Sequence, residues 1–239
     1  EGMAGYQQMA RSVLVVSAII VATTQARAMR LVCAGTSVVA LFLIGARSEL
    51  YGFFGGFAIV EFIVSRKSAV GRAMLISALV VLLGVVAANL SVLQGSRQLE
   101  ILDLSESSSW IVRDQLQMLS MRMIIDSPLL GEYAGHWRYG PGAYSHNALS
   151  AWVSLGLPGL LLFLSSCVVA ASVAIQTLLR SPDSPWARLA ALTNILTLVL
   201  VIIAKPVFWE FPPLAWGLAV AAMIEYRLRS RPMHDNVPR

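Results

Sequence analysis

Residues 147–179 read NALSAWVSLGLPGLLLFLSSCVVAASVAIQTLL, an apolar run without a charged side chain. As one straight helix it would extend roughly 50 Å, at about 1.5 Å per residue, and the hydrocarbon core of a bilayer is only about 30 Å thick. Gly156, Pro158 and Gly159 interrupt the run. We therefore predict a short interfacial or re-entrant helix over 147–155, a break at 156–159, and a membrane span that continues to about residue 178.

The composition of the whole chain also indicates a membrane protein. Of the 239 residues, 57% are hydrophobic and 13% are charged, and the mean hydropathy is +0.70. A soluble domain carries about 25% charged residues, so the excess apolar surface is expected to face lipid. The predicted fold is an all-α integral membrane protein with about seven transmembrane helices. These cover residues 9–26, 30–46, 48–65, 73–93, 147–179, 187–204 and 208–226.

The arginines and lysines between the spans predict the orientation. They gather in four short segments, which contain Arg27 and Arg30; Arg66, Lys67 and Arg72; Arg180 and Arg188; and Arg227, Arg229 and Arg231. All four segments fall on one side of the predicted spans, which makes that side cytoplasmic. This orientation divides the chain into four segments. They are four spans (1–93), a periplasmic loop (94–146), the interfacial helix with three spans (147–226) and a cytoplasmic tail (227–239). Seven spans would leave residue 1 outside, so we expect further spans before Glu1.

The loop 94–146 is the one large polar segment, with four arginines and six acidic residues. It is predicted to contain a helix from Trp110 to Asp126, because apolar side chains recur there at helical spacing. Those side chains are Val112, Leu116, Leu119 and Met123. Ser127-Pro128 ends this helix, and a glycine-rich stretch leads to Tyr144.

Several polar residues near the outer face are candidates for chemistry. Arg47 is either a loop charge that reaches the interface or a phosphate-binding group. Arg113 is favoured over Arg122, because the two point to opposite sides of a straight helix. His146 suits proton transfer near neutral pH, and Asn147 either assists it or caps the next helix. Near the last loop, Lys205 is expected to be a plain positive charge.

The sequence excludes several classes of function. It contains no nucleotide-binding glycine loop and no HExxH or GxSxG motif. The three histidines are scattered and Cys33 and Cys167 are isolated, so no metal site or disulfide is predicted. Membrane orientation accounts for most of the basic residues, so the net charge of +5 predicts no nucleic-acid partner. No cofactor is expected.

Three motifs together resemble the O-antigen ligase and polymerase superfamily of bacterial envelope enzymes. They are RDQLQMLS at 113–120 followed by DSPLLG at 126–131, HNAL at 146–149, and GLPGL at 156–160. Ala46-Arg47-Ser48 is similar to a further element of that family. The chain departs from the family pattern at Gln117, where an aromatic residue is usual, and at Ser154, where glutamate is usual. Members have ten to twelve or more spans, so the resemblance covers their C-terminal part.

The resemblance implies a metal-independent glycosyltransferase of the bacterial inner (plasma) membrane, with an active site that faces the periplasm. The donor would be a glycan on undecaprenyl diphosphate, and the acceptor hydroxyl would belong to lipid A–core or to another glycan. Arg47 and Arg113 would bind the diphosphate, and His146 would accept the proton of the attacking hydroxyl. Asn147, Gly156 and Gly159 would orient or shape the site.

Alternatives remain at this point. An O-antigen or exopolysaccharide repeat-unit polymerase of the same superfamily would use the same donor with a different acceptor. A transporter of polysaccharide or lipid-linked glycan would favour charges near the bilayer midplane and paired broken helices, for which only Glu61 is a candidate. A structural membrane subunit is the third possibility.

Overall fold

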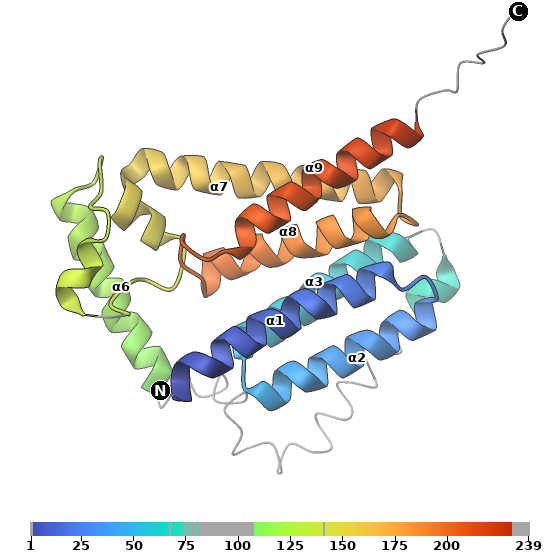
Figure 1. The fold of residues 1–239 in the computed structure, drawn as a ribbon, viewed down its shortest axis with the longest axis horizontal. Helices are drawn as coiled ribbons and strands as arrows, with labels where there is room; N and C mark the ends of the chain where they lie inside the picture. Colours follow the sequence, from blue (N-terminus) through green and yellow to red (C-terminus); the bar gives the residue numbers. More distant parts are fainter. Residues whose placement is uncertain are drawn as a thin grey trace, which may run out of the picture.

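The computed structural model describes residues 2–66, 68–73, 76, 80, 108–140 and 142–230. All regular secondary structure in these residues is helical, as predicted (Figure 1). The helices are α1 (Gly2–Thr23), α2 (Arg27–Ile44), α3 (Arg47–Ser65), α6 (Ser108–Asp126), the 3₁₀ helix η2 (Gly135–Tyr139), α7 (Leu149–Arg180), α8 (Pro185–Ile203) and α9 (Phe211–Arg229). Most of the predicted span 73–93, the start of the loop and the tail beyond residue 230 lie outside the described residues.

Four of these helices are long and apolar enough to cross a membrane, namely α2, α3, α7 and α8. They indicate a multi-pass membrane protein, and they coincide with four of the predicted spans. Helices also form over the predicted spans 9–26 and 208–226, as α1 and α9, but these are not among the four. The total of seven spans therefore stays a prediction.

Helix α8 forms the centre of the bundle. It packs against α1, α3, α7 and α9, and 72% of its apolar window is buried inside the protein, compared with 22% for α2. Gly52 of α3 allows close approach, because a Cβ there would lie 3.1 Å from Leu200. Asn194 joins α8 to α9 by donating a hydrogen bond to the Ala215 carbonyl at 2.7 Å. Most of α8 is therefore covered by other helices of the bundle.

The four basic segments gather at one end of the bundle, where α2 and α8 begin and α3, α7 and α9 end (Figure 1). Arg30 Nε donates to Glu61 Oε1 at 2.7 Å, and both side chains are buried. Arg188 of α8 donates to the Gln25 side chain at 3.0 Å. The clustering agrees with the orientation argument, and it puts Glu61 at an end of the bundle rather than at its middle.

The predicted break in α7 occurs at Gly156, whose φ of +70° and ψ of −175° are not helical. The turn after α6 docks on this kink through main-chain hydrogen bonds. Glu132 N donates to Val153 O at 2.6 Å, and Leu157 N donates to Pro128 O at 3.1 Å. A Cβ on Gly156 would lie 2.0 Å from Leu129 O, so only glycine permits this approach.

Two further glycines complete this junction. Gly131 has a φ of +66°, and a Cβ there would lie 2.4 Å from Gly156 N. Gly159 follows the kink, where a Cβ would lie 2.2 Å from Leu155 Cβ. Of the two glycines that the sequence singled out, Gly156 therefore shapes the junction between α6 and α7, and Gly159 shapes the kink within α7.

We expect Gly156→Ala to destabilise the protein strongly. The φ of +70° with ψ of −175° is a conformation that essentially only glycine adopts; it costs an L-residue about 1–3 kcal/mol, and the clash with the Leu129 carbonyl adds to that cost. Thermal unfolding of the purified protein in detergent measures the loss. Gly217→Ala in α9 is the matched control, because nothing lies within 4 Å of an added Cβ there. Equal melting temperatures for the two variants would contradict the proposed role of the junction.

Candidate functional site

Helix α6 lies across the end of the bundle opposite the basic segments (Figure 1). The C-terminal half of the predicted apolar stripe of α6 packs against α7, because Met123 is buried against Val153 and Leu119 joins the same cluster. Val112, at the other end of the stripe, is 52% exposed. Trp152 Nε1 donates to Pro128 O at 2.8 Å and ties the first segment of α7 to the end of α6.

A small pocket of about 100 Å³ opens between α6 and the loop before α7. It brings together three predicted site residues, Arg113, His146 and Asn147. Among the described residues, its lining consists of Arg113, Asp114, Gln117, Ser145, His146, Asn147 and Ile203. Arg113 and Arg122 are both exposed on α6, but only Arg113 lines this pocket.

Asn147 fixes the turn that carries His146. Its side-chain Oδ1 accepts hydrogen bonds from the Ser145 hydroxyl at 2.6 Å and from Leu149 N at 3.0 Å. Its main-chain carbonyl accepts from the Ser150 hydroxyl at 2.7 Å. Asn147 therefore closes an Asx turn directly before α7, whose N-cap residue is Ala148, and this turn carries His146 to the pocket.

The surroundings of His146 keep its imidazole neutral. Burial, followed by the charges of Arg113 and Lys205, lowers its pKa to about 4. At neutral pH the ring has a free nitrogen lone pair and can accept a proton. The pocket thus combines a potential proton acceptor with an arginine that can bind an anion.

Lys205 is not the plain surface charge that the sequence predicts. It is 6% exposed and forms an ion pair with the carboxylate of Glu49, which is 3% exposed. Its Nζ also lies 5.8 Å from the centroid of the Trp209 ring. This pair joins the start of α3 to the end of α8, so a fixed positive charge lies near His146.

Arg47 is placed differently from Arg113. It is the first residue of α3 and is half-buried, but it does not line the pocket of His146. It precedes Glu49, the partner of Lys205, and so lies at the same end of the bundle as the pocket. The structure therefore brings His146, Arg113 and Asn147 together and leaves Arg47 beside them.

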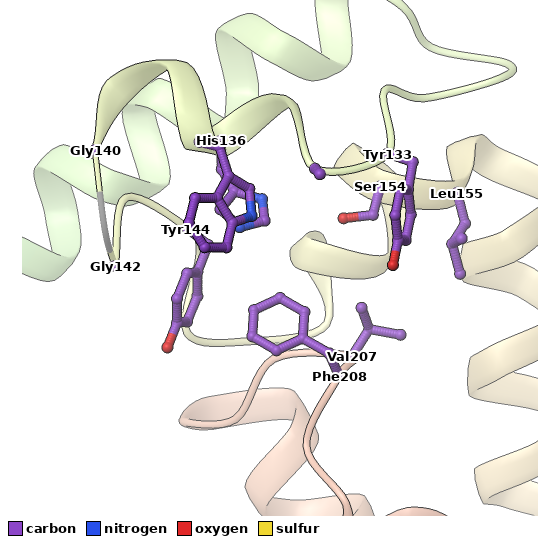
Figure 2. A pocket seen from close by; sticks show the side chains of 11 residues that line it. Tyr133, His136, Gly140, Gly142, Tyr144, Ser154, Leu155, Val207 and Phe208 are labelled. Atoms are coloured by element: carbon purple, nitrogen blue, oxygen red, sulfur yellow. The ribbon is translucent and has the colours of Figure 1, made fainter. Parts of the chain in front are cut away.

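A second, larger pocket of about 500 Å³ lies beside the first, and Figure 2 shows its side chains. Its walls come from the glycine-rich stretch, the first segment of α7 and the loop between α8 and α9. Its lining consists of Tyr133, Ala134, His136, Trp137, Gly140, Gly142, Tyr144, Ser154, Leu155, Val207 and Phe208. Sequence reasoning missed this pocket, although its aromatic residues and glycines are visible in the sequence.

Tyr144 separates the two pockets. Its ring centroid lies 4.7 Å from that of Phe208, on the side of the larger pocket, and 4.8 Å from that of His146, on the other side. The loop that carries Phe208 is held by Val207 N, which donates to the Ser150 hydroxyl at 2.7 Å. A ligand in the larger pocket would therefore be one aromatic ring away from the imidazole of His146.

The described residues contain no group of three or more His, Cys, Asp or Glu that could hold a metal ion. Comparison of the sequence with protein-family models and with curated proteins finds no match. The family resemblance therefore stays a prediction that depends on the motifs, and the function has to be argued from the geometry of the two pockets.

We predict that His146 stays neutral down to about pH 4, well below the usual histidine pKa of 6.5. Since the folded-state pKa is lowered, protonation opposes folding, and stability should fall as the pH drops from about 6.5 towards 4. Nitrogen-15 NMR of labelled histidine measures the titration. Arg113→Ala should raise the pKa, because a positive charge is removed, whereas Arg122→Ala should not change it. Titration of His146 near pH 6.5 would contradict this description.

Proposed function

We propose that this protein is a membrane glycosyltransferase that moves a glycan from undecaprenyl diphosphate to an acceptor hydroxyl at the periplasmic face, in the manner of an O-antigen ligase. One observation carries the proposal, which is the meeting of neutral His146 with Arg113 in one pocket. This pocket lies at the end of the bundle opposite the basic segments, and that end is the periplasmic one by the positive-inside rule.

The proposed reaction needs few protein groups, because a diphosphate is already a good leaving group. The acceptor oxygen forms a bond to the anomeric carbon, and the bond from that carbon to the diphosphate oxygen breaks with its electron pair. Arg113 binds the diphosphate and neutralises its growing charge, with Arg47 as the proposed second cation. The proton of the acceptor hydroxyl passes to His146. Attack opposite the leaving group inverts the anomeric centre.

The low pKa of His146 also fits this scheme. In the free protein, the charges of Arg113 and Lys205 oppose protonation of the ring. A bound diphosphate would offset those positive charges and raise the pKa towards the working pH, where a general base is most effective. His146 would then become a stronger base only when the donor is present.

The location suits an amphipathic donor. The tail of a polyprenyl diphosphate lies in lipid, and its charged group lies at the membrane interface. The pocket of His146 lies where α8 ends, since Ile203 is both the last residue of that helix and part of the lining. The diphosphate could therefore reach Arg113 while its tail remains between lipid chains.

We expect His146→Ala to reduce glycan transfer by about 10²–10⁴-fold with normal protein abundance, since general-base assistance is typically worth that much. Arg113→Ala should also reduce transfer, because the diphosphate loses a charged partner. The assay is transfer of a radiolabelled glycan from its undecaprenyl diphosphate in membranes. Arg122→Ala, an exposed arginine on the same helix, is the matched control and should keep full activity. Full transfer by His146→Ala would refute the assignment.

The glycan profile of a deletion strain distinguishes the acceptors. A ligase predicts loss of every repeat from lipid A–core, which is the result we expect. Single repeats that remain on the core would indicate a repeat-unit polymerase instead, and an unchanged lipopolysaccharide with altered free polysaccharide would indicate an exopolysaccharide system. Donor turnover by the purified protein separates all of these enzymes from a transporter.

A further inference from the structure

We infer that the larger pocket binds a pyranose ring of the acceptor glycan beside the pocket of His146. This inference rests on the proposed function and adds the chemical class of ligand for a pocket that the motifs do not reach. Its support comes from the shape of the pocket, its aromatic faces, its hydroxyl groups and its charge.

The aromatic side chains offer flat faces to a ring. His136 and Phe208 are nearly parallel, with an interplanar angle of 17° and centroids 5.9 Å apart. Tyr144 lies edge-on to both, at 77° to His136 and 80° to Phe208 (Figure 2). A pyranose has an apolar face of C–H groups that packs on such rings. A volume of about 500 Å³ is within the range of small-molecule sites and accommodates one or two sugar rings.

A serine hydroxyl in this pocket is open to a ligand. Ser154 is 7% exposed, its oxygen points into the pocket, and no hydrogen bond joins its side chain to the described part of the chain. Ser166, on the same helix, instead donates to Leu162 O at 2.8 Å. A sugar hydroxyl in the pocket could therefore exchange a hydrogen bond with Ser154. The hydroxyl of Tyr133 also faces the pocket (Figure 2).

The charges separate acceptor from donor. The larger pocket has no arginine or lysine in its described lining, whereas the smaller one contains Arg113. An uncharged sugar therefore suits the larger pocket, and a diphosphate suits the smaller one. Tyr144 packs against both Phe208 and His146, so a sugar held in the larger pocket would lie one aromatic ring away from the imidazole. A hydrocarbon chain would leave the Ser154 hydroxyl unsatisfied.

Saturation-transfer-difference NMR tests this inference on the full chain in nanodiscs. The probes are the methyl glycosides of glucose, galactose, mannose, rhamnose and N-acetylglucosamine, and farnesol serves as an isoprenoid probe. The variants are Phe208→Ala and Ser154→Ala. The matched controls are Phe62→Ala, an exposed phenylalanine of α3, and Ser166→Ala, whose hydroxyl bonds within its own helix.

We expect at least one glycoside to bind to the parent protein through its C–H protons. Each pocket variant should raise the Kd of that glycoside roughly three- to tenfold, as the loss of one aromatic contact or hydrogen bond does. The controls should bind like the parent protein. Absence of glycoside binding, equal binding by the pocket variants, or displacement of the glycoside by farnesol would overturn the inference.

The two proposals fail separately. If glycosides bind as expected but His146→Ala transfers glycan normally, the sugar site stands and the proposed function fails. If transfer depends on His146 but glycosides do not bind, the proposed function stands and the sugar site fails.

Discussion

The contact between two stretches of backbone, the turn after α6 and the kink of α7, is the constraint on which the site depends. Gly131 and Gly156 both have a positive φ, and an added Cβ on either would meet main-chain atoms of the opposite stretch within 2.5 Å. The hydrogen bonds of Glu132 N and Leu157 N satisfy main-chain groups that a helix break leaves open. Because backbone meets backbone, the position of α6 relative to the bundle has little freedom.

The site follows from that contact. Once α6 is held, Arg113 faces the turn before α7, where Asn147 and its hydrogen bonds to Ser145 and Leu149 direct His146. The ion pair of Lys205 with Glu49 joins two other helices and adds a fixed charge nearby. Such buried pairs cost solvation free energy and contribute little net stability. At this position the pair has an electrostatic effect, because it helps to keep the imidazole neutral.

The two ends of the bundle differ in chemistry. One end gathers basic segments whose arginines are held by Glu61, by Gln25 and by the carbonyl of Leu179. The opposite end has one arginine in a small polar pocket and an aromatic pocket beside it. The first arrangement agrees with the positive-inside rule, and the second is the end to which we assign the proposed donor and acceptor. This difference between the two ends agrees with a functional site at only one end of the bundle, the end that carries the two pockets.

The sequence alone determined the helical membrane architecture, the clustering of the basic segments and the break at Gly156, because hydropathy, charge between spans and glycine φ are local properties. It also singled out Arg113, His146 and Asn147, because these residues belong to short sequence motifs. Only the tertiary structure decided that Lys205 is buried with Glu49, that Arg47 lies outside the pocket of His146, and that Ser154, Tyr144 and Phe208 enclose a second pocket. Those relations join residues far apart in the chain, so they depend on how the helices pack and not on any local pattern.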